Sequence, residues 1–102
     1  MASGLFGQAS LTAATDTTVF TIAVTPTVFN VNIVNTTGSP VGINLAVASS
    51  ATPTAGEYLE FQTVIPANGV LERGGIVSTA GERVVAYANA AGVSVNVYGY
   101  EG

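Results

Sequence analysis

The sequence predicts an all-β protein, a jelly-roll-like antiparallel sandwich of about eight strands. Three observations favour this fold. Val, Thr, Ile, Tyr and Phe, which are enriched in strands, dominate the chain. Clusters of Gly, Pro, Asn, Ser and Thr interrupt it about every 8–12 residues, which is the turn spacing of a sandwich or barrel. No segment shows the sustained period of about 3.6 residues that marks a helix.

The front of the chain predicts two strands, "GLFGQASL" at residues 4–11 and "TTVFTIAV" at residues 17–24. Residues 1–15 form either the first strand or an arm used in assembly. They carry no basic region and no long apolar segment of the kind found in a signal peptide. We expect the 102 residues to form a single domain, residues 1–102, since no linker or internal repeat divides them.

The clearest predicted strand is "TVFNVNIVNT", residues 27–36, because its residues alternate strictly. Apolar side chains should face a core, and polar ones should face away from it: Phe29, Val31 and Ile33 inward, Asn30 and Asn32 outward. A turn at residues 36–40 leads into "VGINLAVA", residues 41–48. This second strand also alternates, with Val41, Ile43, Leu45 and Val47 inward. We expect the two strands to form an antiparallel pair.

A loop, "SSATPTAG" at residues 49–56, precedes a predicted strand at residues 57–65 that ends at Pro66. Alternation places two sets of side chains on opposite faces of this strand: Leu59, Phe61 and Thr63 on one, Tyr58, Glu60 and Gln62 on the other. The second set has the composition of a solvated face.

The dipeptide Asn68-Gly69 predicts a tight turn, because both residue types tolerate positive φ. Further strands are expected at residues 70–73, 75–78, 83–89 and 93–101. In the last of them the apolar and polar side chains should again separate, with Val93, Val95 and Val97 inward and Ser94, Asn96 and Tyr98 outward.

The amino-acid composition argues against a catalytic function. The chain has no cysteine, histidine, lysine or tryptophan, so it lacks the commonest general base and the thiolate nucleophile. With two arginines against six acids its net charge is −4, which disfavours nucleic acid and anionic membranes as partners. We therefore expect no enzyme, no cofactor, and no catalytic, cofactor-binding or metal-binding residue.

Charge is both scarce and unevenly placed. Charged residues make up 8% of the chain, against about 25% in an ordinary soluble domain. Interface cores are depleted in charge, so this scarcity favours a surface covered by partners. Six of the eight charged residues lie between Glu57 and Arg83, and residues 1–56 contain only Asp16. Either the first half holds inner strands and Thr-rich turns, or its outer face is buried against another chain.

The acidic residues offer few candidate sites. Two pairs of oppositely charged residues are neighbours in sequence, Glu72-Arg73 and Glu82-Arg83. We interpret each pair either as charges at the edge of a turn or as part of a salt bridge between subunits. A bulge at Gly74-Gly75 could bring the first two residues to one side. Glu57 and Glu60 lie three residues apart in a strand and face opposite sides, which argues against paired glycosidase carboxylates.

Two other features need an interpretation. "NTT" at Asn35 matches a glycosylation sequon, which we attribute to chance. Tyr87, Tyr98 and Tyr100 either pack on a half-buried sheet, anchor an interface or stack on a sugar ring.

Four segments in the second half of the chain carry a family resemblance: Tyr58–Phe61, Pro66–Gly75 ("PANGVLERGG"), Ala80–Val85 ("AGERVV") and Val93–Gly99 ("VSVNVYG"). With the opening "GLFGQASLTAATDTTVFTI" and the strand "FNVNIVNTTG", they resemble small structural proteins of tailed bacteriophages, including those of cyanobacterial phages. The shared motifs consist of residues that form turns and strands, and they include no catalytic residue.

This resemblance implies a structural protein of a virion, made in the host cytoplasm and placed on the capsid surface or the tail. We expect a capsid decoration or cement protein that assembles as a symmetric homo-oligomer, with a trimer favoured, against the major capsid protein or tail proteins. The alternative is a tail, baseplate or fibre component that binds host-surface glycans through the 49–56 loop and exposed tyrosines. We also expect the nearly uncharged N-terminal third to form much of the contact, so that deleting residues 1–15 abolishes association but preserves the β structure.

Overall fold

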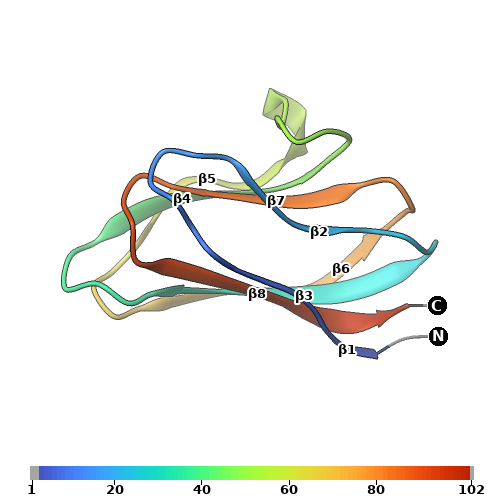
Figure 1. Cartoon of the computed structure of the whole chain (residues 1–102), viewed down its shortest axis with the longest axis horizontal. Helices are drawn as coiled ribbons and strands as arrows, with labels where there is room; N and C mark the ends of the chain where they lie inside the picture. Colours follow the sequence, from blue (N-terminus) through green and yellow to red (C-terminus); the bar gives the residue numbers. More distant parts are fainter. Residues whose placement is uncertain (1–2, 102) are drawn as a thin grey trace.

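The computed structural model describes residues 3–101 as two antiparallel sheets packed face to face (Figure 1). The eight strands are β1 (Ser3–Ser10), β2 (Thr17–Thr21), β3 (Thr27–Asn35), β4 (Val41–Ala48), β5 (Tyr58–Ile65), β6 (Val70–Ser78), β7 (Arg83–Ala88) and β8 (Val93–Glu101). A short 3-10 helix, η1 (Ala55–Glu57), precedes β5. The predicted all-β sandwich is confirmed.

The strand order is β1-β8-β3-β6 in one sheet and β2-β7-β4-β5 in the other. Six of the seven connections between the described strands carry the chain from one sheet to the other. The exception is the connection from β4 to β5, which are neighbours in one sheet. This order is that of a jelly roll, in which two four-stranded sheets enclose one core. The edges β5 and β6 lie on one side of the sandwich, joined by the turn at residues 66–69.

The predicted pairing of the strands at 27–36 and 41–48 is wrong. β3 pairs with β6 and β8, whereas β4 pairs with β5 and β7, so these two strands belong to different sheets. The turn between them carries the chain across the sandwich. Alternation shows that one face of each strand is buried, but the burying partner can be a facing sheet as well as a neighbouring strand.

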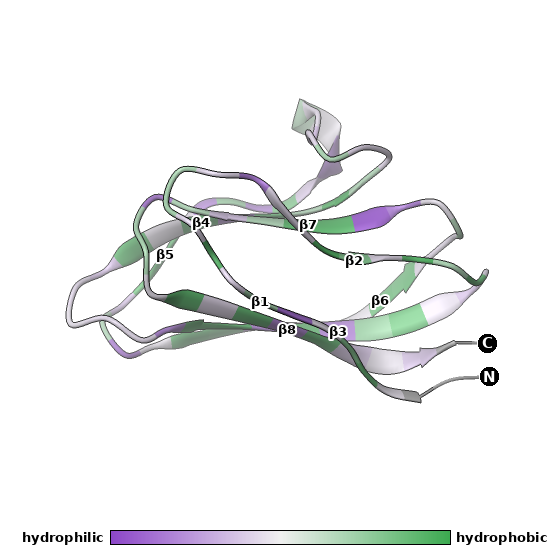
Figure 2. Cartoon of the chain, in the orientation of Figure 1, coloured by the Kyte–Doolittle hydropathy of each residue, from purple (hydrophilic) through white to green (hydrophobic). Residues whose placement is uncertain are grey.

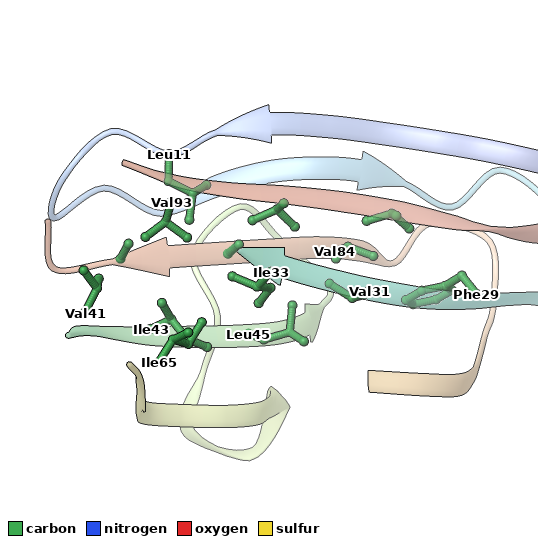
Figure 3. Close-up of a cluster of buried hydrophobic side chains, with 14 of the residues drawn as sticks. Leu11, Phe29, Val31, Ile33, Val41, Ile43, Leu45, Ile65, Val84 and Val93 are labelled. Carbon is green, nitrogen blue, oxygen red and sulfur yellow. The ribbon is translucent and has the colours of Figure 1, made fainter. Parts of the chain in front are cut away.

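The core lies between the two sheets, and Figure 3 shows its side chains meeting there. The predicted inward residues Phe29, Val31 and Ile33 are at most 1% exposed. Burying such a side chain contributes roughly 1.5–3 kcal/mol. Other buried members come from the strands of both sheets: Val41, Ile43, Leu45, Ile65, Val84, Val93, Val95 and Val97. Val47, also predicted inward, is half-buried and packs against this core.

Asn35, at the end of β3, connects the two sheets through its side chain. Its Nδ2 lies 2.8 Å from the Ser39 carbonyl oxygen and 3.1 Å from those of Ile65 and Pro66. Its Oδ1 accepts hydrogen bonds from the Thr37 N–H at 3.0 Å and hydroxyl at 2.7 Å. Asn35 is fully buried, so the sequon that it begins is a structural element of the 36–40 turn.

Strand β5 departs from the predicted alternation because it contains irregularities. Its register against β4 shifts twice, and Gln62 adopts a positive φ of 53°. Glu60 consequently lies opposite the core residue Leu45, on the inner side, while Phe61 is 57% exposed. The predicted inward position of Phe61 and outward position of Glu60 are therefore wrong, because an inserted residue reverses the faces that follow it.

Residues 70–78 form one strand, β6, rather than the two short strands expected. The bulge anticipated at Gly74-Gly75 is present, since the register against β3 shifts where Phe29 faces Ile76 and Val31 faces Arg73. The N–H of Gly75 donates to Asn30 Oδ1 at 3.0 Å, and Gly75 has a φ of 67°. The strand therefore continues through the two glycines with a bulge at their position.

Residues 3–10 form β1, an edge strand paired with β8. Leu11 follows it into the core at 3% exposure, and its N–H donates to the Val93 carbonyl at 2.8 Å. Deleting residues 1–15 would therefore remove an edge strand and a core side chain. That the remaining chain keeps its β structure stays a prediction. Across residues 3–101 no helix is long and apolar enough to cross a membrane.

Candidate interaction surfaces

The outer face of the β1-β8-β3-β6 sheet carries a cluster of apolar and aromatic side chains, which we call the tyrosine face. It consists of four exposed residues and the half-buried Val28: Leu5, Val77, Tyr98 and Tyr100 with Val28. Register places them side by side, since Leu5 lies opposite Tyr98, and Val28 lies opposite both Tyr100 and Val77. Tyr100 is 50% exposed and Val77 is 64% exposed. The cluster thus spans all four strands of the sheet at one end of the sandwich.

A polar row borders the tyrosine face on the same sheet. Gln8, Asn96, Asn32 and Glu72 lie opposite one another on successive strands. The Gln8 side-chain amide donates to Asn96 Oδ1 at 2.9 Å, which links the first two residues of the row. Figure 2 shows hydrophobic segments, in green, on strands of both layers.

The outer face of the β2-β7-β4-β5 sheet carries a different feature, a hollow of about 500 Å³ that we call the amide hollow. Its lining residues come from the end of this sheet and the turns beside it: Pro40, Gly42, Asn44, Gln62, Val64, Tyr87 and Asn89. Asn44 lies opposite Tyr87, and Gly42 lies opposite Val64. Three primary amides and one phenol therefore meet in a space without a charged side chain in its described lining.

Hydrogen bonds from backbone N–H groups hold two of these side-chain amides in place. The N–H of Gln62 donates to Asn44 Oδ1 at 2.7 Å, and the N–H of Gly42 donates to Asn89 Oδ1 at 3.2 Å. Each bond uses the carbonyl oxygen of the side chain and orients its NH₂ group. A Cβ at position 42 would lie 3.1 Å from Asn89 Nδ2, so glycine leaves space at the base of the hollow.

A third feature lies under the 49–56 loop, where Pro53, Ala55, Tyr58, Leu59 and Phe61 line an apolar hollow of about 550 Å³. The rings of Tyr58 and Phe61 are 4.9 Å apart in an edge-to-face arrangement. Ala46 and Val85 alternate with core residues, so their side chains face the outer side of the sheet. Both are nevertheless at most 1% exposed.

Two glutamates hold turns of identical sequence, "TAGE" at residues 54–57 and 79–82. In each turn the glutamate carboxylate accepts the threonine N–H at 2.9 Å and the threonine hydroxyl at 3.1 Å. Glu57 also accepts the N–H of Ser49 at 3.0 Å. The backbone bonds from Thr54 and Ser49 hold the pKa of Glu57 below its ordinary value. Sequence analysis missed this repeat, although the threonine-to-glutamate spacing could have revealed it.

The arginine in Glu72-Arg73 does not pair with its sequence neighbour. Arg73 Nη1 lies 3.0 Å from Glu60 Oε2, and Glu60 also accepts the Thr63 hydroxyl at 2.7 Å. Glu82 likewise bonds to Thr79. Neither sequence-adjacent pair forms a salt bridge among the described residues.

The three candidate tyrosines do not form one site. Tyr98 and Tyr100 belong to the tyrosine face, whereas Tyr87 lines the amide hollow on the opposite side of the sandwich. Glu57 and Glu60 also separate, since Glu57 holds the loop and Glu60 faces Arg73. Residues 3–101 contain no cluster of three or more side chains suited to metal binding.

Comparisons of the chain with family models, curated proteins and solved structures found no match. The fold and these surfaces therefore carry the functional argument.

Proposed function

We propose that the chain is a non-enzymatic structural protein of a bacteriophage virion that works by assembling, in the first place as a capsid decoration or cement protein. The tyrosine face is the observation that carries the assembly role. The resemblance of residues 57–101 to small phage structural proteins supports the virion. The jelly roll adds support by analogy alone, because viral capsid domains and lectins both use it.

The grouping of the exposed residues is more informative than their exposure. Single apolar side chains on a surface are ordinary, but contiguous ones mark interaction sites. Leu5 is 57% exposed and Val77 is 64% exposed, and register joins them through Tyr98, Tyr100 and Val28 into one surface. Tyrosine is enriched at interface centres, since its ring buries a large area and its hydroxyl can bond at the rim.

The partner that this face fits best is a further copy of the chain. The described residues on the outer side of this sheet include one carboxylate, Glu72, which lies in the polar row. Arg73 points to the other side, toward Glu60, and Arg83 belongs to the other sheet. An apolar contact between copies of this face leaves no charge buried without a partner. Closed symmetric homo-oligomers are the commonest assemblies, and a trimer would match the threefold positions of a capsid lattice.

A tail, baseplate or fibre component is the second candidate, because the same face would serve assembly there. Electron cryomicroscopy of purified phage particles that contain this chain's gene distinguishes the two. Density for the sandwich at regular positions on the shell is the expected result. Density confined to the tail would transfer the proposal to the second candidate, and particles without the chain would overturn both.

A further inference from the structure

We infer that the amide hollow is a binding site for a neutral saccharide. Asn44, Gln62 and Asn89 would hydrogen-bond the sugar hydroxyls, and Tyr87 would supply an aromatic surface and a hydroxyl. This inference goes beyond the assembly proposed above and does not rest on it, because the hollow and the tyrosine face lie on opposite sheets.

The hollow is built by the fold and not by a flexible loop. Asn44 and Tyr87 are register partners on the two central strands of their sheet, β4 and β7. Gln62 reaches the hollow through the irregularity in β5, where its φ is 53°. A positive φ at a residue other than glycine is uncommon, and such positions gather at functional sites.

The polar groups of the hollow are oriented before any ligand arrives. Asn44 and Asn89 use their carbonyl oxygens for the backbone N–H groups of Gln62 and Gly42, so their NH₂ groups remain as donors. Gln62 and Asn89 are exposed, and Asn44 and Tyr87 are half-buried, so all four are open to solvent. Fixed donors bind a ligand with a smaller loss of side-chain entropy than mobile ones.

The chemistry of the lining selects the ligand class. Primary amides and a phenol both donate and accept hydrogen bonds, as sugar hydroxyls do. No charged side chain belongs to the described lining, so a phosphate or another ion would find no counter-charge there. Pro40 and Val64 add apolar walls for the C–H faces of a sugar ring. The volume of about 500 Å³ lies within the usual range of small-molecule sites, about 300–1,000 Å³.

This assignment keeps Tyr87 from the hypothesis made from the sequence but places the site away from the 49–56 loop. The hollow at the 49–56 loop is lined by Pro53, Ala55, Tyr58, Leu59 and Phe61, of which Tyr58 alone has a side chain that hydrogen-bonds. A saccharide needs several directional partners, and the amide hollow supplies four.

Nuclear magnetic resonance titration of the isotope-labelled full chain tests the inference. The probes are the methyl glycosides of glucose, galactose, mannose and N-acetylglucosamine. At least one should cause saturable shifts of the side-chain NH₂ signals of Asn44, Gln62 and Asn89, with a dissociation constant of about a millimolar, as expected for a shallow neutral site. The shifts should persist at high salt, because no charge pair contributes.

Two variants locate the binding. Asn89→Asp keeps the acceptor for the Gly42 N–H but removes the NH₂ donor, and Tyr87→Phe removes only the hydroxyl. Each should weaken binding about two- to tenfold. Asn96→Asp is the matched control, because it makes the same change on the opposite sheet and keeps the acceptor for Gln8. Signal dispersion checks that each variant is folded.

Three results would overturn the inference: no saturable shift with any of the four sugars, shifts centred on Pro53–Phe61, or equal affinities for Tyr87→Phe, Asn89→Asp and the Asn96→Asp control. None of them bears on the assembly proposal, which is measured by oligomeric mass.

Discussion

Glu60 of β5 and Arg73 of β6 form an ion pair of 3.0 Å between the edge strands of the two sheets. The side chain of Glu60 is 17% exposed and that of Arg73 is 43% exposed. The pair links the two sheets on the side of the sandwich where the 66–69 turn also joins them. The Thr63 hydroxyl supports it by donating to the same carboxylate at 2.7 Å.

Arg73→Ala should lower the free energy of unfolding by about 1 kcal/mol, the upper range for partly exposed pairs. The loss should shrink as salt is added, because salt screens the pair. Urea unfolding at low and high salt measures both effects. Glu72→Gln is the control, since it removes a neighbouring charge on the outer face, and it should change stability by less than about 0.5 kcal/mol. Equal losses in the two variants would show that the pair contributes nothing.

Gly99→Ala should destabilise the fold by about 3 kcal/mol, because the site has no room for a methyl group. A Cβ there would collide with the Val28 carbonyl oxygen and lie 2.7 Å from Phe29 Cα, and backbone atoms of β3 cannot rotate away. Gly38→Ala is the matched control, since no atom lies within 4 Å of its Cβ position. Thermal unfolding of the two variants makes the comparison, and equal melting temperatures would contradict this packing.

Asn35→Ala should cost about 3 kcal/mol, because it leaves buried groups of the 36–40 turn and the end of β5 without partners. Asn32→Ala, in the same strand but on the outer face and half-buried, should cost about 0.5 kcal/mol. Urea unfolding measures both. A mild effect of Asn35→Ala would mean that the connection between the sheets does not depend on this side chain.

Glu57 makes the 49–57 loop sensitive to acid. Its pKa is lowered in the folded state by the backbone bonds from Thr54 and Ser49, so its stabilising contribution is complete above the ordinary carboxyl pKa and is lost as the pH falls through the lowered value. The carboxyl carbon signal should titrate below that of an unfolded glutamate. Amide hydrogen exchange at Thr54 and Ser49 should accelerate as the Glu57 carboxylate becomes protonated. Glu57→Gln should show this fast exchange already at neutral pH. An ordinary pKa would contradict the assigned bonds.

The parts of the fold that sequence analysis predicted are those in which strict alternation decides burial. Residues 27–35, 41–48 and 93–101 are strands with nearly every predicted inward side chain buried. Alternation says nothing of which strand lies beside which, and this is why β3 and β4 were paired wrongly. It also fails at an inserted residue, which is why Phe61 and Glu60 exchanged faces.

The candidate surfaces were less predictable. The tyrosine face joins residues as distant as Leu5 and Tyr100, and only the register of β1, β8 and β3 brings them together. The amide hollow depends on the bulge at Gln62 and on Asn44 lying opposite Tyr87. Tyr98 and Tyr100 were proposed as interface residues from their place on a strand, and their exposure is consistent with that proposal.

Sedimentation equilibrium of the purified full chain at micromolar concentration tests the central claim, assembly through the tyrosine face, most directly. The wild-type chain should have the mass of a closed oligomer, with three times the mass of one chain favoured. A double variant, Tyr98→Ser with Tyr100→Ser, should sediment as a single chain while its circular dichroism remains that of a β-sandwich. A single-chain mass for the wild type, or an unchanged oligomer for a folded double variant, would contradict the account.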